Sequence, residues 1–223
     1  IYRDIQGRVL ASKHYVRFRY QYYYGYKIDY ITGYEADLLD AYETRTDIRT
    51  FQFGLQYLYS FNYGKFSLKA PFAMNERQKQ SAGSFVAGAG FHMYTLDADS
   101  ALIPNDLALL TANENKFSEL NVVSLMANFG YMYSIVIKGR FFITLGLIPG
   151  IGMKNGDYRV GNRIPMTSSL ALGAQSMSAI GYNGMRIFVG LQLFTNYYYL
   201  PLDKDLKSSV LEGRSALYFG YRF

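Results

Sequence analysis

The chain has 223 residues, no cysteine and no tryptophan, but 23 tyrosines and 16 phenylalanines. Hydrophobic residues make up 50% of it and charged residues 18%, which indicates one folded domain over residues 1–223 and excludes a disordered chain, a disulfide scaffold and a cysteine-based zinc site. The net charge of +6 arises from scattered Lys and Arg, so the sequence does not favour nucleic-acid binding.

Ten segments of the chain alternate hydrophobic residues with polar or small ones, a period of two that is typical of β-strands. In chain order they span residues 5–9, 16–30, 51–59, 66–74, 85–93, 123–135, 141–151, 167–180, 185–199 and 216–223. The chain has no run of ~18 apolar residues, so transmembrane helices are not expected. The pattern predicts an all-β protein of about ten antiparallel strands.

Such strands could form a soluble sandwich or barrel with the apolar face inward, or a transmembrane barrel with the apolar face outward. The second face is rich in Gly, Ser, Thr, Asn and Gln and poor in Glu, which suits a crowded interior better than a solvated surface. Tyrosines gather toward strand ends, as at Tyr24, Tyr26, Tyr197 and Tyr199, where a membrane interface favours amphipathic rings. We therefore expect a transmembrane β-barrel.

The last strand carries a further signal. Leu217, Phe219, Tyr221 and the terminal Phe223 occupy alternate positions, and this ending resembles the terminal targeting strand of bacterial outer-membrane proteins. The resemblance implies a bacterial outer-membrane location, insertion by the barrel-assembly machinery and contact with outer-membrane lipid. The first ten residues lack the basic head and apolar stretch of a cleavable signal, so we expect a mature chain or a fragment.

Four stretches resemble an uncharacterised family of outer-membrane β-barrel proteins of Bacteroidota, which are Gram-negative; the family is filed as a domain of unknown function. They are NERQKQSAGSF from Asn75, FFITLGLIPGIG from Phe141, GYNGMRIFVGL from Gly181 and the closing YFGYRF. The resemblance runs through most of the chain. It implies a signal peptide and further strands upstream, so about ten strands would become twelve in the intact protein. The family has no assigned activity, and the resemblance implies no catalytic residue or cofactor.

Turn chemistry predicts which loops share a side. Short glycine-bearing turns at residues 138–140 and 181–184 fall on the periplasmic side with Phe223, and loops 154–165, 201–212 and 96–118 fall outside. Counting further back puts the long loop 32–46 in the periplasm and the short turn 62–65 outside. Because long loops normally face outward, we expect a miscounted strand in the N-terminal half.

Enzymatic chemistry and metal binding are not expected. Ser84 and His92 share a strand face but stand about 26 Å apart at strand spacing, too far for a nucleophile and its base. Two groups of loop carboxylates could supply hard-cation ligands, but their spacing matches no calcium motif. These groups are Asp97, Asp99, Asp106 and Glu114, and Glu35, Asp37, Asp40 and Glu43.

Charges on the polar strand faces are the remaining candidate site. They are Arg17, Arg19, Lys27, Lys69, Arg186 and Arg222, with Asp29 the one acidic member. An excess of interior cations is typical of an anion-selective pore or an anionic-ligand site, but ion pairs and bound water would also satisfy it. We favour the second explanation, because side chains nearly fill a barrel of this size.

These observations predict an integral outer-membrane β-barrel with a non-enzymatic role as a structural or accessory subunit of an outer-membrane protein complex. Its expected partners are lipid, the assembly machinery and other outer-membrane proteins, contacted at the long loops 96–118 and 32–46. The alternative is a narrow channel or binding barrel for a small anionic solute, and an enzyme that acts on lipids ranks third.

Overall fold

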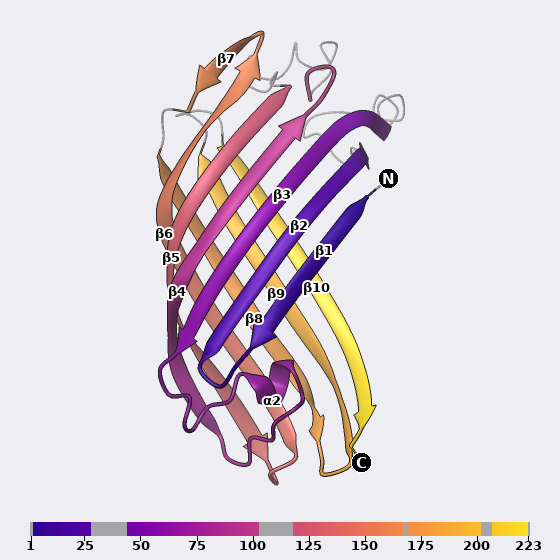
Figure 1. The fold of residues 1–223 in the computed structure, drawn as a ribbon, viewed down its shortest axis with the longest axis vertical. Coiled ribbons are helices and arrows are strands. Elements are labelled where there is room, and N and C mark those ends of the chain that lie inside the picture. The colour runs from indigo at the N-terminus through magenta and orange to yellow at the C-terminus, as the bar shows by residue number, and fades with distance from the viewer. Residues whose placement is uncertain (1, 28–43, 103–117, 167–168, 202–206, 223) are drawn as a thin grey trace, which may run out of the picture.

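The computed structural model describes residues 2–27, 44–102, 118–166, 169–201 and 207–222, and nearly all of them lie in one antiparallel sheet (Figure 1). The strands are β1 (Arg3–Leu10), β2 (His14–Lys27), β3 (Thr44–Ser60), β4 (Ala82–Asp97), β5 (Glu119–Ile137), β6 (Phe141–Val160), β7 (Asn162–Pro165), β8 (Leu170–Asn183), β9 (Ile187–Pro201) and β10 (Lys207–Tyr221). The predicted all-β, antiparallel fold is confirmed.

Nine of these strands pair in chain order, β1-β2-β3-β4-β5-β6-β8-β9-β10, and form a curved wall. Each strand is antiparallel to the next, so chain direction reverses at every step. Figure 1 shows that the wall curls around a long axis into an incomplete barrel. We call its two ends the α2 end, where β1 and β10 finish, and the β7 end, where they begin.

One of the ten predicted strands was wrong. Residues 66–74 form no strand; they contain the four-residue helix α2 (Lys69–Phe72) and cover the α2 end of the wall. The alternating hydrophobic residues of this segment are all buried, and Pro71 cannot donate a ladder hydrogen bond. Their period of two therefore reflects burial inside the wall. Within the described residues, no helix has the length and hydrophobicity needed to cross a membrane.

The expected miscount in the N-terminal half is confirmed by this change. Without a strand at 66–74, the facing ends of β2 and β3, Lys27 and Thr44, lie at the β7 end, as do Asp97 and Glu119. Most of the loops predicted at 32–46 and 96–118 lies outside the described residues, but the strands that flank them now share one end. The strands that flank the long connections 28–43 and 98–118 therefore end at the β7 end, whereas the connections at the α2 end are short apart from residues 61–81.

The strand β7 was not predicted. It folds back on the last residues of β6, from Asp157 to Val160, through a turn at Gly161. Gly161 has φ +67°, a backbone conformation that glycine adopts without strain. The predicted loop 154–165 is therefore wrong, because these residues form the end of β6, a turn at Gly161 and β7.

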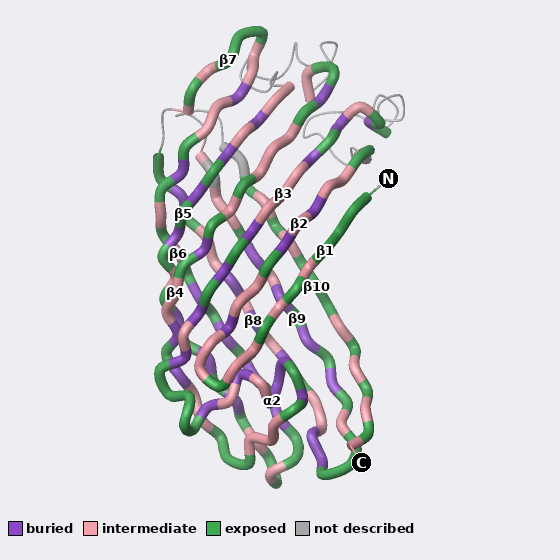
Figure 2. The backbone as a smooth tube through the Cα atoms, viewed as in Figure 1, coloured by how far each residue is buried: buried purple, intermediate pink, exposed green. Residues whose placement is uncertain are grey.

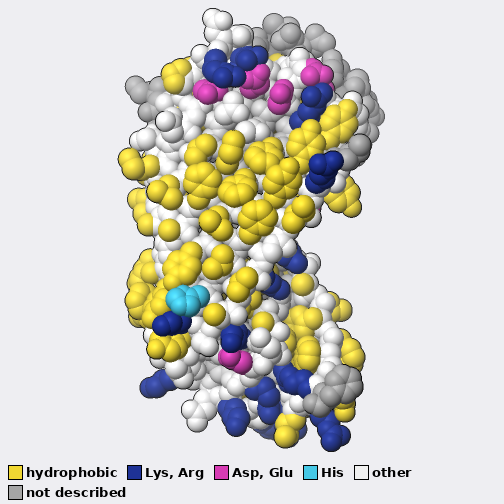
Figure 3. Space-filling view, in the orientation of Figure 1, with side chains coloured by type: hydrophobic (Ala, Val, Ile, Leu, Met, Phe, Trp, Pro, Cys, Tyr) yellow, Lys and Arg dark blue, Asp and Glu magenta, His cyan; other side chains and the backbone are white. Residues whose placement is uncertain are grey.

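The outer face of the wall is apolar over its middle. Large hydrophobic side chains with 36% or more of their surface exposed occur on every strand of the wall, and on β6 alone they are Phe141, Ile143, Leu145, Leu147, Ile151 and Met153. Figure 2 shows buried and exposed positions alternating along the strands, and Figure 3 shows hydrophobic side chains across the middle of one face, with charged ones gathered toward its two ends. The outward-facing apolar set predicted from the sequence is confirmed.

The wall has two unpaired edges. β1 pairs only with β2 and β10 only with β9, so the described strands leave a seam between β1 and β10. Side chains bridge it from the inside: Arg8 donates to Gln192 Oε1 on β9 at 2.8 Å, and Arg19 forms an ion pair with Glu212 on β10. Figure 3 shows this face hollowed at its waist.

Candidate functional site

The interior of the wall is the candidate site, and apolar side chains fill its α2 end. Phe66, Leu68 and Phe72 of the segment between β3 and β4 are at most 1% exposed. They belong to one cluster with side chains from the surrounding strands, Tyr15, Leu58, Val86, Met132, Phe142, Ile148, Met177 and Phe194. We call residues 61–81 the plug segment, because its buried hydrophobic side chains, from Phe66 to Met74, occupy the cross-section at this end.

Two buried amide side chains hold the plug segment to the wall. Asn183, at the end of β8, donates to the backbone oxygen of Glu76 at 2.9 Å and to that of Ala70 at 3.4 Å. Gln192 on β9 donates to the backbone oxygen of Pro71 at 3.0 Å. Both amides are at most 5% exposed, so no solvent competes for these hydrogen bonds.

Arg222 adds a contact from the C-terminal strand. Its guanidinium donates to the backbone oxygens of Gly184, at 2.7 Å, and Met74, and to Asn183 Oδ1 at 2.8 Å. The same group lies 4.8 Å above the ring of Phe188. Arg222, which the sequence places among the interior charges, therefore links the end of β10 to the plug segment.

Lys69 also stabilises the plug segment. The alternation placed it on a strand, but it lies in α2 and forms an ion pair with Glu76 at 3.0 Å. Ser67 Oγ donates to the same carboxylate at 2.7 Å and accepts the backbone N–H of Ala70 at 3.1 Å. The hydrogen bond from Ser67, helped by Lys69, lowers the pKa of Glu76 from its usual 4.5. The ionised carboxylate thus stabilises the first turn of α2.

A polar layer crosses the interior above the plug segment. Gln56 on β3 and Gln175 on β8 exchange two amide hydrogen bonds, at 2.8 and 3.1 Å, although β4, β5 and β6 separate their strands around the wall. Both amides are buried, at 7% and 4% exposure. This pair spans the interior and leaves no wide passage at its level.

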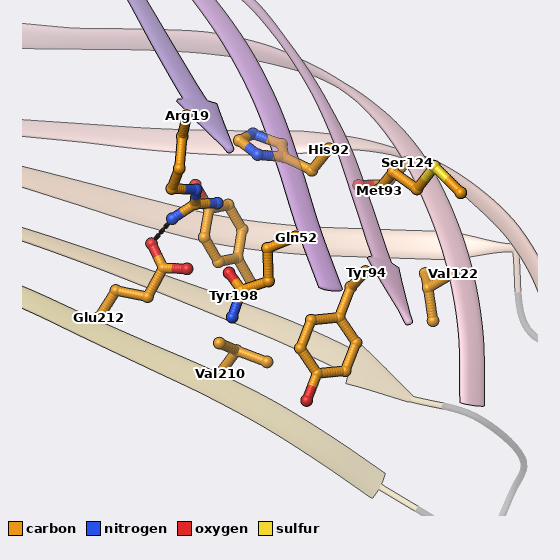
Figure 4. Close-up of a pocket in the computed structure, with 10 residues that line it drawn as sticks. All are labelled: Arg19, Gln52, His92, Met93, Tyr94, Val122, Ser124, Tyr198, Val210 and Glu212. Carbon is orange, nitrogen blue, oxygen red and sulfur yellow. Dashed lines mark ion pairs between the residues drawn. The ribbon is translucent and has the colours of Figure 1, made fainter. Parts of the chain in front are cut away.

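An ion pair lies next to this layer, toward the β7 end (Figure 4). Arg19 on β2 is 5% exposed and pairs with Glu212 on β10, while the rings of His92 and Tyr198 lie 4.7 Å apart, centroid to centroid. These four side chains line a cavity of about 30 Å³, shown in Figure 4. That volume holds one or two water molecules. The predicted excess of interior charge is thus partly neutralised here.

Arginines concentrate beside the seam. Arg8 on β1 and Arg17 on β2 are directly opposed in the ladder, and Arg214 on β10 lines the same small cavity. No carboxylate among the described residues forms an ion pair with any of the three. Among the described side chains, Arg17 donates to Gln6 Oε1 at 3.4 Å, and Asp4 accepts hydrogen bonds from Gln6, Gln21 and Tyr23.

The other predicted site residues lie elsewhere or outside the described part. Arg186, predicted in the interior, is exposed in the turn before β9, because that strand begins one residue later. Lys27 ends β2 at the β7 end, and Asp29 lies outside the described residues, as do Asp106, Glu114 and the acidic group 35–43. No group of three metal-binding side chains occurs in the described ranges.

The remaining sequence hypotheses can also be placed. Ser84 bonds to Ser60 Oγ at 3.0 Å, near the α2 end, whereas His92 packs on Tyr198, so the two form no catalytic pair. Leu217 and Phe219 face outward with 80% and 74% of their surface exposed, and Tyr221 is also exposed. Phe223 lies outside the described residues.

The residues that organise the interior were not identifiable from the alternating pattern. Gln56, Gln175 and Gln192 look like ordinary polar members of alternating strands, Asn183 falls in the predicted turn 181–184, and Glu212 falls in a predicted loop. One signal was present: glutamine and asparagine at inward positions are long enough to bond across a narrow interior. Their pairing requires the curvature of the wall, which the sequence pattern does not contain.

The fold and the interior define a barrel-like antiparallel β-protein whose concave side is filled by its own side chains and by the plug segment. The chain belongs to the family described as Domain of unknown function (DUF4421), whose model matches residues 1–223. No curated protein and no solved structure matches it.

Proposed function

We propose that this protein is an integral outer-membrane β-barrel of Gram-negative bacteria with a non-enzymatic role, a structural or accessory subunit of an outer-membrane protein complex. The observation that carries the proposal is the inverted distribution of side chains. Large apolar residues face outward on every strand of the wall, while the concave side is closed by the plug segment and the Gln56–Gln175 pair. Because the interior leaves no wide passage for a solute, we expect the protein to act through contacts at its outer surface and its loops.

The membrane location is tested by the depth dependence of a charge on the outer face. Leu147 and Met153 both face outward from β6, with 62% and 71% of their surface exposed, and Leu147 is near the middle of the apolar band. In a bilayer, Leu147→Arg costs about 2–4 kcal/mol near the midplane and Met153→Arg about 0–1 kcal/mol near its edge. On a solvated surface both changes stay within about 0.5 kcal/mol of zero. Equal, small effects in urea unfolding from vesicles would refute the membrane proposal.

The accessory role is tested by purification from native outer membrane in mild detergent. We expect another outer-membrane protein to co-purify, at a constant ratio that survives a second affinity step. The predicted contact surface is the β7 end, where the strands that flank residues 28–43 and 98–118 end. If all of the protein in the outer-membrane fraction were recovered as a pure monomer, the accessory role would be refuted. The proposed barrel would be unaffected.

A specific observation supports the alternative, a channel or binding barrel for a small anionic solute. Arg8, Arg17 and Arg214 lie around one cavity without an ion-pair partner among the described residues. Planar bilayers distinguish the two proposals. The accessory subunit gives no steady conductance, whereas steady anion-selective current that is lost in Arg17→Gln would favour the alternative.

A further inference from the structure

The α2 end carries a concentrated positive charge. Seven basic residues in its turns and loops are exposed or half-exposed, and one of them, Arg77, donates to the backbone oxygens of Asn183 and Gly139. We call the other six the basic rim: Lys13, Lys65, Lys79, Lys138, Arg140 and Arg186. None of them forms an ion pair with a described residue. The connections described at this end contain one acidic residue, Glu76, and Lys69 neutralises it. Figure 3 shows Lys and Arg side chains gathered at this end of the molecule.

At the β7 end, several of the described cations are instead paired with carboxylates. Glu119 contacts Arg159 at 2.7 Å and Arg163 at 3.1 Å, and Arg163 also lies 3.5 Å from Asp157. The basic rim, by contrast, has no described carboxylate beside it other than Glu76, so its cations create a local positive potential. The asymmetry is a property of the described surface and needs no assumption about the interior.

The surroundings of the basic rim favour a membrane surface as its partner. Exposed apolar side chains flank the basic positions: Ile137 and Phe141 border the turn that holds Lys138 and Arg140, and Met185 and Ile187 border Arg186. Lys13 lies 5.4 Å from the centroid of the Tyr63 ring. Long basic side chains beside apolar and aromatic ones are typical of a bilayer interface, where the stems contact acyl chains and the charges reach headgroups.

The distribution of the basic rim around the wall favours lipid over a protein as its partner. Its members come from the β1–β2, β3–β4, β5–β6 and β8–β9 connections, and so from most of the perimeter. A docked protein contacts one flank, whereas headgroups surround the whole rim. We propose that the basic rim binds anionic phospholipid headgroups of the leaflet at the α2 end. This inference rests on the proposed membrane location, but not on the accessory role.

The test uses the purified protein reconstituted in vesicles of phosphatidylcholine, alone or mixed with phosphatidylglycerol. The lipids that remain bound after mild detergent extraction are then quantified. We expect phosphatidylglycerol to be enriched over its share in the vesicles, and 1 M salt, which shortens the screening length to about 3 Å, to reduce the enrichment. The triple variant Lys65→Gln, Lys138→Gln, Arg140→Gln should lose most of the enrichment, about tenfold or more, because each basic residue near an anionic surface contributes separately.

The matched control removes the same charge from the other end. Arg3→Gln, Arg49→Gln, Arg163→Gln should keep the enrichment. Equal losses in both triple variants, or no enrichment in the unchanged protein, would overturn the inference. A third arm replaces phosphatidylglycerol with lipopolysaccharide, and equal enrichment there would refute the assignment to a phospholipid leaflet. If the rim variant retains phosphatidylglycerol and instead loses a co-purifying acidic protein, the rim is a protein contact.

Failure of this inference is distinguishable from failure of the proposed function. A protein that does not insert into phosphatidylcholine vesicles, judged by the accessibility of its turns to protease, would contradict the membrane location itself. A protein that inserts without selecting phosphatidylglycerol would leave the location intact and remove only the lipid site. The effect of salt on phosphatidylglycerol enrichment is measured on the unchanged protein. It therefore tests the lipid site even if the triple variant fails to fold.

Discussion

Arg8 and Arg17 lie directly opposite each other in the β1–β2 ladder, with no ion-pair partner among the described residues. Like charges placed directly opposite destabilise a pair of strands. Arg19, two residues along β2, is in the reverse situation, because it pairs with Glu212 and is 5% exposed. Two arginines on the same face of one strand therefore contribute to stability with opposite signs.

Replacing Arg17 should stabilise the protein and replacing Arg19 should destabilise it. Arg17→Gln removes a repulsion and is expected to raise the free energy of unfolding by about 0.2–1 kcal/mol. Arg19→Gln leaves the Glu212 carboxylate without its partner in a largely buried site and should cost about 3 kcal/mol. Urea unfolding of both variants in the same vesicles measures the difference. A clear loss of stability in Arg17→Gln would mean that Arg17 has an anionic partner, which would support the alternative function.

Asn183 should control the plug segment. Asn183→Ala removes hydrogen bonds to the backbone of Ala70 and Glu76 and to Arg222, and leaves buried acceptors unsatisfied, at a cost of about 1–3 kcal/mol. We expect protease to cut residues 61–81 faster while the wall stays intact. Asn62→Ala is the control: its side chain donates to the backbone oxygen of Gly83 in an exposed position. Equal cleavage in both variants would show that Asn183 does not hold the plug segment.

Acidification should release the first turn of α2. The pKa of Glu76 is lower in the folded protein than its usual 4.5, so the stabilising contribution is fully present above 4.5 and disappears as the pH falls through the folded-state value. Protease accessibility of residues 61–81, measured with an acid-active protease between pH 6 and about 3, should rise below pH 4.5. In Glu76→Gln the same dependence should be much weaker. An unchanged pH profile in that variant would assign the transition to other carboxylates.

The C-terminal strand should be needed for insertion. Leu217, Phe219 and Tyr221 face outward in β10, as the targeting-strand hypothesis requires, and Phe223 follows them. Deletion of Phe223 should leave most of the protein aggregated or degraded instead of inserted in the outer membrane, as judged by heat-modifiable mobility on gels. A deletion variant that inserts normally would count against this hypothesis, and Ser215→Ala, on the same strand, is the control for a general loss of β10.

The strands were predictable because successive side chains of a β-strand point to opposite faces of the sheet. In β5 and β6, an apolar residue at every second position must face one side of the wall, and the predicted facing of Phe129, Leu145 and Leu147 is confirmed. The same rule failed at Phe66, Leu68 and Phe72, because alternation alone does not distinguish a wall strand from a segment buried inside the wall. Pro71 argued against a strand at this position, because proline cannot donate a ladder hydrogen bond.

The candidate site was less predictable, because contacts across the interior depend on how the wall closes. The sequence identified Arg17, Arg19 and Arg222 as inward charges, but not Glu212 as the partner of Arg19 or Met74 and Asn183 as partners of Arg222. These partners lie 39 to 193 residues away in sequence; for Arg19 and Glu212, the separation is 212 − 19 = 193. No local pattern encodes such pairs. The basic rim was missed for a similar reason, since its members are scattered in sequence and meet only at one end of the fold.

The direction of the two edge strands restricts how the wall can close. β1 and β10 both run from the β7 end to the α2 end, because eight antiparallel pairings separate them. If the two edges paired with each other, that one junction would be parallel while every other junction stays antiparallel. To close the seam with antiparallel pairings alone, an odd number of additional strands would have to lie between β10 and β1. The total would then be even, as it is in bacterial single-chain barrels. Ten and twelve strands satisfy this parity, and nine and eleven do not.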